Sequence, residues 1–424
     1  MTSSQTPPPG DPTTAPAVPS DLQDERLIAS AGIGGWLSTT WGRLRSGDLG
    51  SLPVVVGLVL IWGVFYALNP AFLSSRNLVN LSLQMVPVGT IAIGVVLVLL
   101  LGEIDLSIGS MSGLSGAILA VLFVNQGVNV WIAIAAALAS GAATGIVYGA
   151  LYNRFGVPSF VITLAGLLAL LGLQIRVLGT DGTINIPFES SLVRFASQLF
   201  LPDAVAYGLA VVVPAVYLIA RIRNNARRTE AGLSTPAVTS LALRAAALAI
   251  LLVLAVSVLN RDRGVSYMLV LFLALVVIMD LAIRRTTWGR SVLAIGGNVE
   301  AARRSGINVK RIYLSVFTLC STFAALGGIL AASRLASANQ SSGGADTNLN
   351  AIAAAVIGGT SLFGGRGSAY SALLGILVIW SISNGLALLS VSADVRYIVT
   401  GAVLLLAVVI DSLSRRSRAS HGQA

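Results

Sequence analysis

A polar segment at 284–311 separates two long apolar stretches and holds the residues best suited to binding a partner. It carries seven basic residues and one acid, Glu300. Asn298 can cap the N-terminus of a short helix there, Glu300 suits the positive end of that helix, and Gly306 can take the left-handed conformation that ends it. Two consecutive arginines shortly before the glycine suit the negative end. We therefore predict a capped surface helix, which in a membrane loop is a candidate contact for a partner outside the bilayer.

Two acids outside that segment, Glu103 and Asp105, have no basic residue near them in the sequence. Acids in or near a bilayer are costly to bury, and they therefore suggest function. Asp105 with Ser107 can instead cap the next helix, and both interpretations stay open. Asn384 can line a path for a polar solute or bond a neighbouring helix, and the second is favoured. Together with Ser361, these residues are the candidate translocation path.

Several kinds of chemistry are excluded by residue types that are scarce. The single histidine, His421, and the single cysteine, Cys320, give no basis for histidine catalysis, a histidine metal site or an intramolecular disulfide. We therefore predict neither a catalytic nor a metal site. The single lysine, Lys310, is followed by Arg311, so the chain contains no G-x-x-x-x-G-K-[ST] phosphate loop. If ATP is used through such a loop, the loop belongs to another polypeptide.

The composition is that of a membrane protein. Hydrophobic residues make up 55% of the chain and charged residues 10%, and the mean hydropathy is +0.85. The net charge of +10 does not indicate a nucleic-acid partner, because the basic residues flank apolar stretches, where they orient a chain in the lipid bilayer. Abundant alanine and glycine are typical of closely packed transmembrane helices.

Apolar stretches of about 20 residues, enough to cross the bilayer core, predict the topology. We place spans near 52–68, 79–101, 106–124, 129–151, 159–178, 203–222, 244–260, 265–283, 313–333, 368–388 and 394–412. A shorter apolar segment, 349–362, is interrupted by glycines. Arginine is concentrated in the loops 221–244 and 284–311 and in the C-terminal tail, which we expect in the cytoplasm. The eleven spans become twelve crossings if 349–362 also crosses, and only then do both termini lie inside, so we predict about 11–12 crossings.

Two glycine- and serine-rich breaks interrupt the helical regularity. They are GEIDLSIGSMSGLSG (102–116) and IGGTSLFGGRGSAYSALLG (357–375), and each leads into an apolar helix. Irregular backbone at membrane depth is tolerated only where protein or a water-lined cavity satisfies its polar groups, and such breaks indicate a translocation path. We predict an all-α polytopic bundle with broken helices at 102–107 and 357–367.

The chain divides into three predicted regions. Residues 1–50 form a cytoplasmic N-terminus that is disordered where it is rich in proline, threonine and serine and interfacial where tryptophan and arginine mix. Residues 51–413 form the transmembrane domain, which includes the loop 284–311. Residues 414–424 form a cytoplasmic tail.

Acids and arginines four residues apart mark two predicted helix ends. Asp280 with Arg284, and Asp411 with Arg415, have the spacing of an ion pair on one helix face. We interpret both pairs as interfacial, marking where a helix leaves the bilayer.

Beyond these local features, the chain resembles the permease subunits of bacterial ATP-binding cassette (ABC) importers for pentoses and related sugars, of the ribose and xylose type. The resemblance covers nearly all of residues 70–412. Its segments are FLSSRNLVNL (72–81), EIDLSIGSMSGL (103–114), VPSFVITLAG (157–166), GRSVLAIGGNVEAARRSGINV (289–309), IAAAVIGGTSLFGG (352–365) and GAVLLLAVVID (401–411). Glu103, and a segment at about 223–283 that resembles an insertion, make the xylose type the most similar.

The resemblance implies that the loop 284–311 contains the coupling helix of an import permease, with Glu300, Ala301, Ala302 and Gly306 matching its E-A-A…G motif. The predicted contacts to the ATPase are Gly296, Gly297, Asn298, Glu300, Ala301, Ala302 and Gly306. The implied partners are an ABC ATPase subunit that holds ATP and Mg²⁺, an extracytoplasmic sugar-binding protein and a second permease copy. The implied location is the bacterial cell membrane.

The predicted function is translocation of a monosaccharide, D-xylose above others, without covalent chemistry in this chain. A permease for branched-chain amino acids or another small solute is the alternative within the ABC class. An ion-coupled secondary carrier would use Glu103 and Asp105 as proton or cation sites. A membrane enzyme is disfavoured, because no constellation of histidine, cysteine or carboxylates has catalytic spacing.

Overall fold

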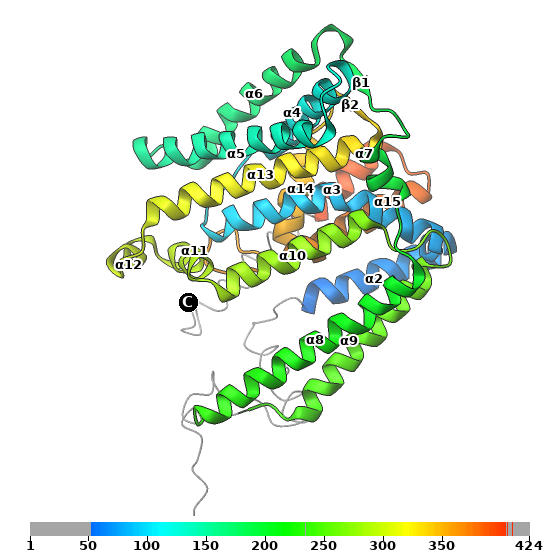
Figure 1. Ribbon diagram of the computed structural model, residues 1–424, viewed down its shortest axis with the longest axis vertical. Coiled ribbons are helices and arrows are strands. Elements are labelled where there is room, and N and C mark those ends of the chain that lie inside the picture. Colours follow the sequence, from blue (N-terminus) through cyan, green and yellow to red (C-terminus); the bar gives the residue numbers. More distant parts are fainter. Residues whose placement is uncertain (1–51, 234, 404, 406–408, 410–424) are drawn as a thin grey trace, which may run out of the picture. The chain divides into compact units, whose positions relative to one another are not determined.

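The computed structural model describes residues 52–233, 235–403, 405 and 409, and this part of the chain is almost entirely helical (Figure 1). Nine of the described helices are long and apolar enough to cross a bilayer. They are α3 (Ser75–Leu100), α4 (Ile108–Ala120) with its π-helical continuation (Val121–Asn125), α5 (Val130–Phe155), α6 (Ser159–Leu178), α8 (Asp203–Glu230), α9 (Val238–Leu259), α10 (Tyr267–Arg285), α13 (Val309–Leu335) and α15 (Tyr370–Leu388). The predicted polytopic helical bundle is confirmed.

Three predicted spans need separate comment. Helix α2 (Leu52–Leu68) coincides with the predicted span, although its 17 residues are few for a crossing. Residues 393–403 are helical within the predicted last span, 394–412, much of which lies outside the described residues. The terminal regions predicted at 1–50 and 414–424 also lie outside the described residues, as do Asp411 and Arg415.

Two predicted segments have the wrong boundaries. The short apolar segment predicted at 349–362 is helix α14 (Ala345–Ile357), and residues 358–369 are irregular, because Gly358 and Gly359 end the helix. The arginine-rich stretch predicted as a loop at 221–244 is helical as far as Glu230 and again from Val238. Arginine forms helices readily and is favoured near a helix C-terminus, and the Arg221 guanidinium lies over the Tyr217 ring one turn earlier, 5.3 Å from its centroid.

The chain separates into two compact units. Among the described residues, the main unit comprises 52–206 and those from 256 onward, and the hairpin unit comprises those within 207–255. The described part of the hairpin unit contains most of α8 and α9, whose connection is held by Asn225, since its side-chain amide donates to Pro236 O at 2.9 Å. The segment that resembles an insertion, at about 223–283, overlaps this unit.

Helix α3 lies at the centre of the main unit, where it packs against α10, α13, α14 and α15. Within its most apolar window 94% of the residues are buried, against 22% for the equally long α5. The hydropathy of the two windows, 2.3 and 2.0, is nearly the same. Composition therefore does not distinguish the central helix from a peripheral one.

Helices α5 and α13 pack closely along a row of glycines. Gly141, Gly145 and Gly149 lie four residues apart on α5 and face α13. A Cβ atom at Gly145 would lie 2.3 Å from Phe317 O, and one at Gly141 would lie 2.6 Å from Ser321 O. Small residues at this spacing let two transmembrane backbones approach each other, as the abundance of glycine predicts.

The main unit has two distinct ends, which α13 connects over about 40 Å. At the N-terminus of α13 lie α11 (Thr287–Gly297) and α12 (Val299–Arg304), and we call this the α12 end (Figure 1). At its C-terminus, β2 (Ser337–Asn339) pairs antiparallel with β1 (Thr183–Asn185), Ile184 opposite Ala338, and we call this the ribbon end. The short elements Pro70–Leu73, Gly179–Asp181, α7 (Ser191–Val193) and Arg194–Gln198 were not predicted.

The chain after the ribbon returns to the α12 end. Asn339 belongs to the ribbon, whereas the Gly365 amide donates to Leu100 O, the carbonyl of the last residue of α3, at 2.9 Å. Residues 339–365, with α14 in the middle, therefore connect the two ends. This supports the prediction that the region crosses the membrane, with a helix of 13 residues and irregular backbone on either side.

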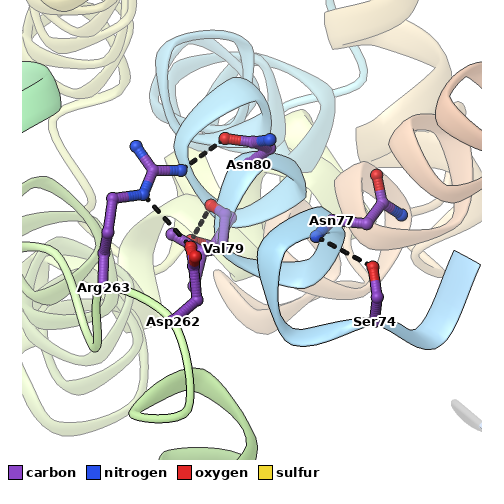
Figure 2. A network of polar contacts seen from close by, with 7 residues as sticks. Ser74, Asn77, Val79, Asn80, Asp262 and Arg263 are labelled. Carbon is purple, nitrogen blue, oxygen red and sulfur yellow. Dashed lines mark hydrogen bonds and ion pairs between the residues drawn. The ribbon is translucent and has the colours of Figure 1, made fainter. Parts of the chain in front are cut away.

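Polar contacts fix the first turn of α3, at the end of the helix opposite Leu100 (Figure 2). The Ser74 hydroxyl accepts a hydrogen bond from Asn77 N at 3.3 Å and caps the helix. Arg263 donates to the Asn80 side chain and pairs with Asp262 at 3.2 Å, so the loop before α10 is held against α3.

Candidate functional site

Helix α12 has the caps that the sequence predicts. The Asn298 side chain accepts a hydrogen bond from Ala301 N at 2.9 Å, as an N-cap does. At the other end, Ile307 N donates to Ala302 O at 3.2 Å and Gly306 N to Arg303 O at 3.1 Å, which is the Schellman arrangement. Gly306 has a φ of +85°, a conformation that glycine adopts without strain. The predicted capped helix is confirmed.

The charges of α12 are paired on its exposed face. Glu300 accepts a hydrogen bond from Arg303 at 2.9 Å and pairs with Arg304 at 3.5 Å, and all three side chains are more than half exposed. Ala301 is exposed, whereas Ala302 is buried against the protein's own surface. Of the two alanines in the motif, Ala301 is thus the one that a partner can contact.

Helix α11 holds the start of α12 in place. Its side chains Val292 and Ile295 are fully buried, and the Trp288 indole donates to the Ser315 hydroxyl on α13 at 2.8 Å. Gly297 ends α11, and Asn298 alone separates it from α12.

The first break, residues 101–107, lies between α3 and α4. Helix α3 ends in another Schellman arrangement, in which Gly102 has a φ of +80° and Glu103 N donates to Val98 O at 3.2 Å. The half-buried Glu103 carboxyl accepts a hydrogen bond from the Tyr152 hydroxyl of α5 at 2.6 Å. Tyr152 stacks on Tyr313 of α13 with 4.5 Å between ring centroids. Glu103 thus joins α5 and α13 to the break.

Asp105 is buried, and its two shortest hydrogen bonds are local. One carboxylate oxygen accepts from Ser107 N at 2.8 Å and from the Ser107 hydroxyl at 2.7 Å, immediately before α4 begins. The Cys320 thiol lies 3.8 Å from the other oxygen. The carboxylate thus bonds the N-cap residue itself, in an Asx turn before the positive end of α4, and the structure shows no side-chain hydrogen bond that caps the first turn of α4.

Side chains from other helices satisfy the backbone of the first break. Ile104 N donates to the Ser159 hydroxyl at 3.4 Å and Leu106 N to the Thr163 hydroxyl at 3.1 Å, both on α6. Leu106 O accepts from the Asn348 side chain on α14. Sequence reasoning missed all three partners. The only signal was the four-residue spacing of Ser159 and Thr163, which puts both hydroxyls on one face of a helix.

The structure does not bring all the candidate path residues together. Asn384 on α15 exchanges hydrogen bonds of 2.7 and 3.0 Å with Asn77 near the start of α3, as the helix-bonding alternative predicts. Leu100 lies at the other end of α3, about 35 Å away along the helix axis. Ser361 lies in the second break, residues 358–369, and its hydroxyl accepts from Phe363 N at 3.2 Å. Glu103, Asp105 and Ser107 do share one break.

The ion pair predicted at the end of α10 is present. Arg284 Nε lies 2.9 Å from an Asp280 carboxylate oxygen, with Asp280 largely buried and Arg284 exposed. The salt bridge lies on the last turns of the helix, before Thr286 caps α11. Its position supports the interpretation that the helix leaves the bilayer there.

Comparisons with known proteins agree with this architecture. Residues 77–408 match the family described as the permease component of branched-chain amino acid transport systems. The xylose transport system permease protein of Escherichia coli K12 is 37% identical over 88% of this chain and 94% of its own length. The Haemophilus influenzae xylose permease is 36% identical over 88% of the chain and 99% of its own length, and the Bacillus subtilis ribose import permease is 34% identical over 88% and 97%.

No solved structure matches the chain. The family model covers well over half of the sequence, and the relatives align over nearly their whole length. Their alignment includes both helix breaks and the segment of α11 and α12. The chain therefore belongs to the family of multi-pass membrane permease components that also includes the xylose and ribose permeases.

Proposed function

We propose that this chain is the transmembrane subunit of an ABC importer that moves a monosaccharide, D-xylose above others, into the bacterial cytoplasm. The relatives named for xylose and ribose support a sugar over a branched-chain amino acid. Sugars are neutral and polar, so the path needs hydroxyl and amide partners rather than free charge. The first break offers such partners, because Ser107, Ser159 and Thr163 lie on it or against it.

The observation that carries the proposal is the capped helix α12, which presents Ala301 between exposed charges at one end of the main unit. A small side chain in that position lets a partner's backbone or side chains approach closely. We assign this surface to an ATPase subunit that binds ATP and Mg²⁺. A separate subunit is needed because this chain has no phosphate loop of its own. The permease itself is not the enzyme of the complex.

The orientation of the chain in the membrane determines where the remaining partners bind. The α12 end faces the cytoplasm, where the arginine excess of 284–311 is expected, and both chain termini lie on the same side. The ribbon end then faces outward, where a sugar-binding protein delivers the solute. Two copies of the chain, each contacting one ATPase domain, form the complete path.

Transport by purified components in proteoliposomes tests the proposal. The chain is reconstituted with its ATPase subunit and binding protein, and uptake of labelled xylose, ribose, galactose and leucine is compared. We expect ATP-dependent uptake of the sugars, xylose most efficiently, and none of leucine. Preferred uptake of leucine would contradict the sugar assignment. Uptake that needs no ATP and collapses with an uncoupler would support the ion-coupled carrier.

A substitution on α12 tests the assigned surface. Ala301→Trp adds bulk to an exposed position and leaves the protein interior unchanged, so the chain should still insert. We expect co-purification of the ATPase subunit to fall by about tenfold or more, as for the loss of a central interface contact. Ala204→Trp is the matched control, since Ala204 is an exposed alanine in the first turn of α8. Normal assembly and uptake with Ala301→Trp would refute the docking surface.

A further inference from the structure

Three segments that are far apart in the sequence meet through glycine at the α12 end. They are the start of the first break, the end of α11 and the middle of the second break. The residues in contact are Gly102, Gly296, Gly297, Gly364 and Gly365, and we call this set the glycine joint. The joint adjoins α12 in the sequence, because Asn298 alone separates Gly297 from that helix.

Gly296 is the residue at which the approach is closest. A Cβ atom there would lie 1.8 Å from Leu100 O and 2.5 Å from Gly365 N. Both neighbours are backbone atoms, so neither can move aside as a flexible side chain would. Any residue other than glycine at this position must push α11 away from α3 and from the second break together.

The second break is bound to α3 at the same point. Gly365 N donates to Leu100 O at 2.9 Å, and so satisfies a carbonyl at the C-terminus of α3 that has no partner within its own helix. Gly364 has a φ of +85°. A Cβ atom on this residue would lie 2.7 Å from Gly296 O and 2.9 Å from Gly102 N. The two breaks and α11 are therefore in direct backbone contact.

A second contact joins the two breaks beyond the joint. The Asn348 side chain on α14 donates to Leu106 O, near the end of the first break. Helix α14 leads directly into the second break. The first break is thus held at its start by Gly364 and Gly365 and near its end by the helix that precedes them.

We propose that the glycine joint transmits movement of α11 and α12 to both helix breaks, with Gly296 as the positioning residue. The inference rests on the proposed function, in which an ATPase subunit moves α12. Movement of α12 displaces Gly296, and Gly296 displaces the end of α3 and the second break in the same step. The two breaks therefore change together, which opens or closes the path on one side of the membrane as a unit.

Two helical glycines allow a matched test in the reconstituted complex. Gly296→Ala adds a Cβ against backbone, whereas Gly172→Ala, on α6 and outside the joint, adds one where nothing lies within 4 Å. We expect the ATPase subunit to co-purify with both variants. Xylose uptake should fall by about tenfold or more in Gly296→Ala and stay within about twofold in Gly172→Ala, a difference in the range of measured coupling energies. Hydrolysis in Gly296→Ala should no longer respond to the sugar-loaded binding protein.

The contrary outcomes are distinct. Equal uptake by the two variants would overturn the joint's role. Loss of the ATPase subunit from Gly296→Ala alone would make the joint a structural support of α12 and would also contradict the proposal. If Gly296→Ala does not insert, amide hydrogen exchange on the unaltered complex decides, because it requires no substitution.

In that experiment, exchange is compared with and without the ATPase subunit and ATP. We expect protection at 299–304, together with altered exchange at 101–107 and 358–367, and no change in the ribbon. Protection of α12 without any change at the breaks would refute the joint and leave the proposed function standing. No protection of α12 would refute the proposed function, and the joint's role with it.

Discussion

The irregular backbone amides of the two helix breaks find their hydrogen-bond acceptors in different groups. In the first break, the backbone amides of Ile104 and Leu106 donate to side-chain hydroxyls of α6, and Ser107 N donates to the Asp105 carboxylate. In the second break, backbone amides donate to backbone carbonyls. Thr360 N donates to Ala355 O at 3.0 Å, and Ser361 N donates to Arg366 O at 3.0 Å. Irregular backbone in a membrane must be satisfied within the protein, and either route achieves this.

The difference lies in what each break needs from its sequence. The first break depends on particular polar side chains, several of them on distant helices. The second depends on glycines that leave room for neighbouring backbone, so steric changes should damage it more than the loss of a polar group. Three substitutions, two of them with a control variant, test this comparison in order of decreasing expected effect.

Gly358→Ala should have the largest effect. A Cβ atom at Gly358 would lie 1.8 Å from Ser371 O. The substitution therefore forces the end of α14 away from the start of α15. The φ of this residue is −68°, so the damage is steric rather than conformational. We expect a loss of about 3 kcal/mol in the free energy of unfolding, measured by denaturation in mixed detergent micelles.

Gly359→Ala is the control for that substitution. Gly359 has a φ of +102°, but a Cβ there meets nothing within 4 Å. Only backbone strain applies, at about 1–2 kcal/mol. An equal loss for the two variants would show that close packing is not what the second break requires.

Asp105→Ala should have an intermediate effect on the first break. The substitution leaves both the amide and the hydroxyl of buried Ser107 without their acceptor, at a cost of about 2 kcal/mol in the free energy of unfolding. Asp105→Asn keeps an acceptor oxygen in place and should lose less than about half of that. If Asp105→Ala is as stable as the unaltered chain, the side-chain route does not stabilise the break.

Ser361→Ala should have the smallest effect, because in the second break a side-chain hydroxyl adds little to the backbone bonds. Its hydroxyl accepts one hydrogen bond, from Phe363 N at 3.2 Å. We expect a loss of about 0.5 kcal/mol, close to the lower limit for one hydrogen bond. The same denaturation measurement checks it, and a loss as large as that of Asp105→Ala would remove the distinction between the breaks.

Local signals in the sequence were enough to locate the main elements of the site. Asn298 and Gly306 lie at the ends of the helix that they cap, so the residues that define α12 are its own neighbours. The breaks could be predicted for the same reason, because glycine interrupts a helix at its own position in the sequence. Their flanking helices end at Leu100 and Ile357, within a few residues of the predicted breaks.

Long-range partners could not be predicted in the same way. Asn348 and Thr163 satisfy the first break from helices that lie far away in the sequence. The spacing of Ser159 and Thr163 indicates a polar helix face, but not what that face contacts. The central position of α3 was equally hidden, because α5 has the same length and similar hydropathy. The glycine joint combines three segments, and each of them by itself looks like an ordinary turn or helix end.

The β-ribbon has a consequence for how the main unit can move. Besides the pairs between β1 and β2, Gln340 N donates to Gly182 O at 3.2 Å, and the Gln174 side chain on α6 donates to Asn339 O at 2.9 Å. These bonds tie α6 and α13 together at one extremity, while no such ribbon joins them at the other extremity of the described chain. The spacing of α6 and α13 is therefore set at the ribbon by hydrogen bonds that must break before these two helix ends can separate.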